Sequence, residues 1–173
     1  MSIVGIPHQA VKVEDGRIVI AIILEWRGKL ALFKRSRSVG HDAGLWHCIT
    51  GYVEAGTAPK VQAAQELSEE TGLRASEVIG FCLGPVLTIT DVQQRSWVVH
   101  TYVVRTFRKR LSVNYEHDSY RWIARHKVMR FSNRVPWLDD VLDATGHLIT
   151  AAPPAACSRT VSGNFMTGDG KTD

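Results

Sequence analysis

Residues 51–73 read GYVEAGTAPKVQAAQELSEETGL and place Glu66, Glu69 and Glu70 at positions i, i+3 and i+4, shortly before Gly72. In an α-helix, Glu69 and Glu70 lie about 60° and 40° to either side of Glu66, so the three carboxylates share one face. We expect a helix over residues 58–71 that ends at Gly72 and presents these carboxylates outward. The residues of the opposite sector, which we expect to form the packing face, are Val61, Ala64, Leu67, Ser68 and Thr71.

Clusters of glutamate are common on solvated helix faces, and this is the alternative to a metal site. Like charges at i, i+4 cost only about 0.2–0.5 kcal/mol per pair, so repulsion does not establish that a cation is present. The preceding loop supports a ligand site, because Gly51 and Gly56 permit close approach of the backbone to a ligand. We expect Thr57 to cap the helix through its hydroxyl group.

The same stretch resembles the Nudix box, G-x5-E-x7-R-E-U-x-E-E-x-G-U, in which U is a bulky aliphatic residue. The family has glutamate where this chain has Thr57, and arginine where it has Gln65. Loss of the arginine removes charge-assisted hydrogen bonds to neighbouring carboxylates, and loss of the glutamate removes an acid near the helix start. We therefore expect a slower enzyme with weaker metal affinity. The fixed positions of the box that match are Gly51, Glu66, Leu67, Glu69, Glu70, Gly72 and Leu73.

The resemblance implies an α/β protein with the Nudix fold, a mixed β-sheet sandwiched between α-helices. It also implies a cofactor, Mg²⁺ or Mn²⁺, bound by Glu66, Glu70 and a more distant glutamate that matches Glu116. Glu69 and Glu116 are the candidate catalytic residues, and which of them removes a proton from the attacking water stays open. The candidate substrate-binding residues are Arg35, Thr50, Gly51 and Asn133.

Segments outside the box resemble the dihydroneopterin triphosphate or dATP pyrophosphohydrolase branch of the family. They are LWHCITG at 45–51, Glu116-His117, YRW at 120–122 and SNR at 132–134. This similarity favours a nucleoside triphosphate or a pterin-like triphosphate as the small-molecule partner. Dinucleoside polyphosphates, nucleotide sugars and RNA 5′ ends are alternatives, and so is a nucleotide-sensing protein with little activity.

Composition is consistent with one modest enzyme domain. The chain has 173 residues, 45% hydrophobic, and no apolar run long enough to cross a membrane. We expect a domain over residues 1–149 and a flexible tail over 150–173, which is rich in Ala, Pro, Ser and Gly. Three cysteines without CxxC spacing indicate reduced thiols, and with no secretion signal they predict a cytoplasmic protein.

The sequence says less about macromolecular partners. The net charge is +4, and the densest basic run lies at residues 105–110. Such a run can attract polyanions, but a solvated turn after a strand is our preferred interpretation, so nucleic acid is not an expected partner. A homodimer is compatible with the sequence.

Alternation of apolar residues predicts the remaining elements. We expect strands over residues 17–25 and 29–34, joined by a hairpin turn at Gly28. Further strands are expected at 46–49, 86–90, 97–107 and 120–123, and a closing helix at 137–144.

Overall fold

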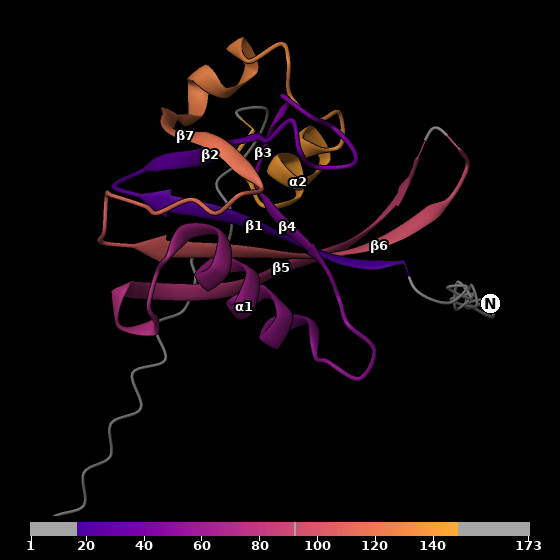
Figure 1. The fold of residues 1–173 in the computed structure, drawn as a ribbon, viewed down its shortest axis with the longest axis horizontal. Coiled ribbons are helices and arrows are strands. Elements are labelled where there is room, and N and C mark those ends of the chain that lie inside the picture. Colours follow the sequence, from indigo (N-terminus) through magenta and orange to yellow (C-terminus); the bar gives the residue numbers. More distant parts are fainter. Residues whose placement is uncertain (1–16, 92, 149–173) are drawn as a thin grey trace, which may run out of the picture.

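The computed structural model describes residues 17–91 and 93–148, and within them one mixed sheet forms the centre of the fold (Figure 1). Its main path is β3-β2-β1-β6-β5, while β4 pairs with β1 and β7 pairs with β2. Strands β1 and β6 are parallel, and the other pairs are antiparallel. The strands are β1 Ile18–Trp26, β2 Lys29–Arg35, β3 Trp46–His47, β4 Ile49–Tyr52, β5 Val78–Thr90, β6 Ser96–Thr106 and β7 His117–Ala124.

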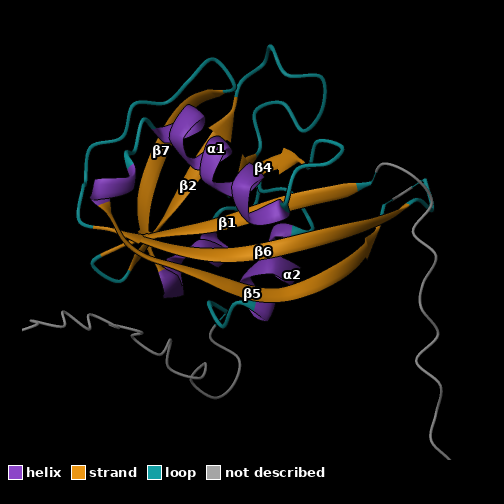
Figure 2. Ribbon diagram, turned by 90° about the horizontal axis from the view of Figure 1, so that it is seen from below, coloured by secondary structure: helices purple, strands orange, loops and turns teal. Residues whose placement is uncertain are grey.

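Two α-helices cover opposite faces of this sheet (Figure 2). Alternate residues of β1 face α1 (Pro59–Thr71) or α2 (Leu138–Ala144), and each set is buried in its own hydrophobic cluster. Short 3₁₀ helices occupy Ala75–Glu77 and Arg125–Arg130. The predicted fold class, a mixed sheet between α-helices, is confirmed.

The predicted hairpin between β1 and β2 is also confirmed. Its two turn residues, Arg27 and Gly28, both have positive φ angles, of 47° and 73°. This is the turn type whose twist matches that of the flanking strands. Arginine is uncommon at the first position, where asparagine, aspartate or glycine is preferred, because a β-carbon crowds the backbone at positive φ.

Several predicted boundaries differ from the structure. Strand β5 begins at Val78 instead of residue 86, and its pairing with β6 shifts near Gly80 and again before Val86. Glycine and proline in this stretch resemble a loop, but β5 is an edge strand, where irregular pairing and Pro85 are tolerated. The predicted cap at Thr57 is wrong, because the N-cap of α1 is Ala58 and Pro59 opens the helix.

The cysteines only partly match the expectation of reduced thiols. Cys48 is a free thiol buried in the core on the α2 side. Cys82 is disulfide-bonded, so the prediction is wrong for that residue. Cys157 and the predicted tail at 150–173 lie outside the described residues. Among the described helices, none is both long and apolar enough to span a membrane.

Glu25, near the end of β1, ties the sheet to the chain that follows α2. Its carboxylate accepts hydrogen bonds from Arg125 Nη2 at 2.6 Å and from His147 Nε2 at 3.0 Å. Burial raises the pKa of Glu25, but the hydrogen bonds to His147 and Arg125 outweigh it, so the pKa lies below its ordinary value. The ionised carboxylate therefore stabilises the fold.

We predict that Glu25→Gln lowers the free energy of unfolding by about 1–3 kcal/mol at neutral pH, because Arg125 and His147 lose a charged partner. Since the folded pKa is depressed, this contribution is present above the ordinary carboxyl pKa and is lost as the pH falls through the folded value. Denaturant unfolding at several pH values should show the wild-type advantage shrinking under acid. A difference that is constant with pH would contradict this account.

Candidate functional site

Helix α1 rests on the sheet with a different face from the predicted one. Val61 is 55% exposed, Ala64 and Ser68 are also exposed, and Glu70 is only 1% exposed. The expectation that the carboxylates all point outward is therefore wrong for Glu70, while Glu69 is exposed and Glu66 is half-buried. Few residues of α1 are bulky and apolar, so its packing stripe includes polar groups. The buried residues of α1 are Gln62, Ala63, Leu67, Glu70 and Thr71.

The end of the helix is as predicted. Gly72 has a left-handed φ of 66°, and its N–H donates to the carbonyl of Ser68 at 2.8 Å. Glycine adopts this conformation without the steric cost that a β-carbon would bring. The site therefore begins and ends at two glycines, Gly51 before α1 and Gly72 after it.

Glu66 is held against the strand that precedes the helix. Its carboxylate lies so close to Gly51 that a β-carbon at Gly51 would collide with it. Gln62 Nε2 donates a hydrogen bond of 3.0 Å to Glu66 Oε1, and Gln62 Oε1 accepts one from the backbone N–H of Glu54 at 3.3 Å. Burial raises the pKa of Glu66, with further contributions from nearby carboxylates such as Glu69. The glycine predicted for ligand approach thus makes room for a carboxylate.

Glu70 is buried with an unsatisfied oxygen. Its Oε2 has no hydrogen-bond partner, and the nearest positively charged or protonatable atom is Nε2 of His117, at 3.6 Å. Burial, reinforced by the charges of Glu116 and Glu66, raises the pKa of Glu70 to about 9, while Arg35 opposes the shift. At neutral pH this carboxyl retains a proton unless a cation neutralises it.

The residues around Glu70 suit a divalent cation. An unpaired buried carboxylate oxygen among other carboxylates provides the hard oxygen donors that Mg²⁺ and Mn²⁺ prefer. As the side chains lie, no three acidic, histidine or cysteine residues in the described ranges form a complete metal-binding group. Mg²⁺ does not need such a cage, because it usually keeps waters and uses one or two carboxylates together with substrate phosphates.

The structure brings Glu116, which precedes β7, close to the carboxylates of α1. Its charge acts on both Glu66 and Glu70, although it is more than forty positions away in the chain. Its backbone is fixed, because its carbonyl accepts from the Ser36 N–H at 2.7 Å and its N–H donates to Asn114 Oδ1 at 3.0 Å. The charge of the residue before β7 therefore acts on two of the α1 carboxylates.

The candidate substrate-binding residues differ in burial and in their position relative to α1. Thr50 and Gly51 lie on β4, which packs beside α1. Arg35 is only 6% exposed and donates from Nε to the carbonyl of His41 at 3.3 Å. Its side chain is therefore buried below the site and has little surface open to a ligand. Asn133 is exposed, and its backbone carbonyl accepts from Trp46, in a loop next to β3.

Sequence reasoning assigned no role to His117. This residue is buried, faces Arg35 in the β2–β7 ladder, and packs with its ring centroid 5.1 Å from that of Phe33. Burial lowers its pKa to about 4, and Arg35 adds to the effect, so the imidazole is neutral. The only sequence signal was its position next to Glu116.

A mixed sheet between two helices, with a carboxylate row on one helix and a glycine loop before it, defines the Nudix class of protein. A family model described as the NUDIX domain matches residues 15–144, and the chain belongs to this family.

Known proteins similar to this chain include one curated relative and many solved structures. An octanoyltransferase of Myxococcus xanthus is 33% identical over 112 residues, which are 62% of this chain and 30% of that protein. The chain therefore spans less than a third of that relative's length.

Solved structures agree on the fold. The MutT protein of Methanosarcina mazei is 19% identical, with a TM-score of 0.63, over 73% of this chain and 89% of that chain. The dihydroneopterin triphosphate pyrophosphohydrolase of E. coli is 14% identical, with a TM-score of 0.62, over 76% of this chain and 96% of that chain. At these identities the likeness concerns the fold alone.

We predict that Gly51→Ala folds with a thermal midpoint close to that of wild type but binds Mn²⁺ about 10-fold or more weakly. The new β-carbon displaces the flexible end of Glu66, which is cheap for folding and costly for a metal ligand. Titration calorimetry and thermal unfolding measure the two effects. Gly40→Ala is the matched control, because a β-carbon there meets nothing. Equal Mn²⁺ affinity in the two variants would contradict the placement of Glu66.

Proposed function

We propose that the protein is a cytoplasmic Nudix pyrophosphohydrolase that requires Mg²⁺ or Mn²⁺. It cleaves a diphosphate linkage in a nucleoside triphosphate or a dihydroneopterin triphosphate-like substrate. The observation that carries the proposal is the buried, unpaired carboxylate of Glu70 beside Glu66 and Glu116. A carboxyl group in this setting is costly for stability and is explained by a cation that binds there.

Each acidic residue then has a role. Glu66 and Glu70 hold the cation, and Glu116 completes the set. When bound, the cation neutralises phosphate charge and lowers the pKa of a water. Glu69 is exposed and therefore able to orient or deprotonate a solvent water, with Glu116 as the alternative base.

The substrate is held from the loop side of α1. Thr50 and Gly51 are the candidate contacts nearest to the carboxylates, and Asn133 is an exposed candidate farther along the chain. The burial of Arg35 favours support of Glu70 over direct contact with phosphate. His117, which is neutral, lies 3.6 Å from the same carboxylate without a hydrogen bond to it.

A nucleotide-binding protein with little hydrolytic activity is the second candidate. Two observations favour it: Gln65 is exposed and offers no charge to the glutamates, and the carboxylates are not gathered into a complete group. Retention of all four glutamates favours the enzyme, because binding alone does not require them.

The test is incubation of the full chain with nucleoside triphosphates, dihydroneopterin triphosphate, dinucleoside polyphosphates, nucleotide sugars and capped RNA, with Mg²⁺ or Mn²⁺. Release of pyrophosphate from a triphosphate supports the proposed reaction. Saturable nucleotide binding without any product would identify the sensor instead. Products from another substrate class would support a hydrolase that acts on a different substrate.

We predict that Glu70→Gln lowers kcat by more than about 100-fold, beyond the usual cost of losing a group that only supports a metal ligand. The fold should persist, because glutamine has the shape and charge of the protonated carboxyl and relieves the repulsion from Glu66 and Glu116. Asp140→Asn on α2 is the matched control, since it removes an exposed helix acid elsewhere. Unchanged turnover in a folded Glu70→Gln protein would refute the central role of this residue.

A further inference from the structure

Three cationic side chains gather around one tryptophan ring at the end of the β1–β2 hairpin. The Arg27 guanidinium carbon lies 5.4 Å from the centroid of the Trp26 ring. Nζ of Lys29 lies 5.9 Å from the same centroid, and Nζ of Lys109 lies 5.4 Å from it. The three groups therefore converge on one point, and no two of them are farther apart than about twice these distances. We call Arg27, Lys29 and Lys109 the Trp26 cation cluster.

The Trp26 cation cluster lies on the α1 side of the sheet, at the end far from the α1 carboxylates. Trp26 is two positions beyond Leu24, which packs in the hydrophobic cluster beneath α1, so its ring lies on that side. Lys29 is directly opposite Trp26 in the hairpin and shares this face. Glu70 lies beside the first residue of β7, which pairs with the last residue of β2, whereas Lys29 is the first residue of β2. The cluster is therefore separate from the proposed metal site.

Two tryptophans hold the chain segment that carries Lys109. The indole N–H of Trp26 donates to the carbonyl of Phe107 at 3.2 Å, and the indole N–H of Trp122 donates to the carbonyl of Lys109 at 2.8 Å. The two indole rings also lie side by side, with 5.8 Å between their centroids. The backbone of Lys109 is thus fixed against the sheet, so little ordering of this segment is needed when a ligand binds.

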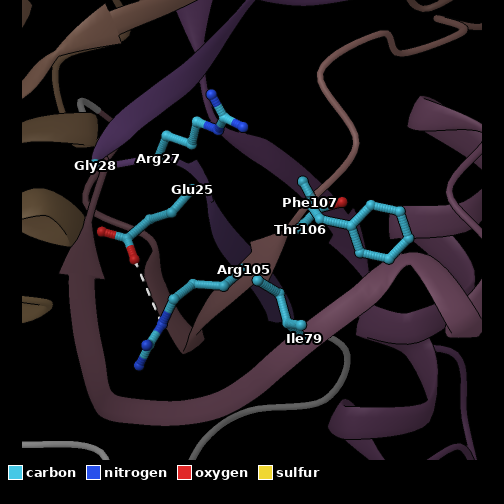
Figure 3. A pocket seen from close by; sticks show the side chains of 7 residues that line it. All are labelled: Glu25, Arg27, Gly28, Ile79, Arg105, Thr106 and Phe107. Atoms are coloured by element: carbon cyan, nitrogen blue, oxygen red, sulfur yellow. Dashed lines mark ion pairs between the residues drawn. The ribbon is translucent and has the colours of Figure 1, made fainter.

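Within residues 17–91 and 93–148, no acidic residue forms an ion pair with the Trp26 cation cluster. The nearby acids have other partners, since Glu25 pairs with Arg105 and Glu77 pairs with Arg108. In the pocket beside the hairpin, Arg27 reaches away from the Glu25–Arg105 pair (Figure 3). Contact with an aromatic ring stabilises a cation without cancelling its charge. The cluster therefore presents three exposed positive charges that attract an anion with several charges.

Single-stranded nucleic acid has the chemistry that matches this surface. Proteins bind such strands with cations along the phosphate backbone and with aromatic rings or guanidinium groups against the bases. Trp26 and Trp122 are each partly exposed, so rings are accessible beside the cations. A bare polyphosphate would leave these rings unused. A membrane anchor would insert its rings into the lipid, whereas both indole N–H groups here are bonded to the protein backbone.

We propose that the Trp26 cation cluster binds single-stranded nucleic acid, with successive phosphates against its three cations and bases against the Trp26–Trp122 pair. The basic run at residues 105–110 does not by itself indicate this partner, because only the fold brings Lys109 to the residues of the hairpin. Neither a divalent cation nor the proposed hydrolase activity is needed for this binding.

The test is binding of a short, fluorescein-labelled oligouridylate to the full chain in EDTA, measured by fluorescence anisotropy over a series of KCl concentrations. Three phosphate contacts on a single strand predict a slope of about −2 for the logarithm of the association constant against that of the salt concentration. The strand should shift the amide NMR signal of Gly28 and leave those of Gly51 and Gly72 in place. No saturable binding, a slope near zero, or shifts confined to Gly51 and Gly72 would overturn the proposal.

Two matched variants separate the cluster from the overall charge of the chain. Lys109→Gln should weaken binding about 5-fold at about 0.1 M salt and make the slope less steep by about 0.7, because one phosphate contact is lost. Its thermal midpoint should match that of wild type, because Lys109 is exposed. Arg95→Gln is the control, since it removes an equal charge above another tryptophan, Trp97, but one already paired with Asp91. Equal oligouridylate affinity in the two variants would overturn the proposal.

Two further ligands test the class of partner. Inorganic polyphosphate of equal charge offers the phosphates without bases, so it should bind about 5-fold or more weakly than the oligouridylate. Vesicles that contain phosphatidylserine offer an anionic lipid surface, and they should bind no more tightly to wild type than to Lys109→Gln. Polyphosphate binding as tight as that of the oligouridylate, or vesicle binding that Lys109→Gln weakens, would overturn the assignment to nucleic acid.

Discussion

The burial of the Glu70 carboxylate between α1 and the sheet is the constraint on which the candidate site depends. A buried carboxyl lacks the hydration that water would provide, and here the neighbouring Glu66 and Glu116 add repulsion. The helix nevertheless packs with this residue inward, because Leu67 and Ala63 share the same stripe and must be covered. Packing of α1 therefore buries a carboxylate at a position where a proton or a cation must offset the lost hydration and the repulsion.

The helix itself could be predicted from the sequence, but its orientation could not. Gly72 and the spacing of the glutamates are local signals, so the end of α1 was correct to the residue. Which face packs depends on contacts with β4, just before the helix, and with β1, which is distant in the chain. The assumption that charge faces water placed Glu70 outside and Val61 inside, and the structure reverses both.

Residues that reach the site from other elements were predictable only by resemblance. Glu116 matched a family position, and the structure brings its charge to the α1 carboxylates. His117 and Arg35 carry no local signal of their position, because both depend on the β2–β7 register. The same limit explains β5, since an edge strand with irregular pairing has the composition of a loop.

The charge distribution gives the proposed nucleotide site at α1 a requirement for a cation. The chain carries a net charge of +4, which favours encounter with anions in general. At and beside α1, however, the acidic groups of Glu66, Glu69 and Glu116 repel a polyphosphate until a cation lies between them. Affinity of the α1 site for the proposed nucleotide substrate must therefore depend on the divalent ion.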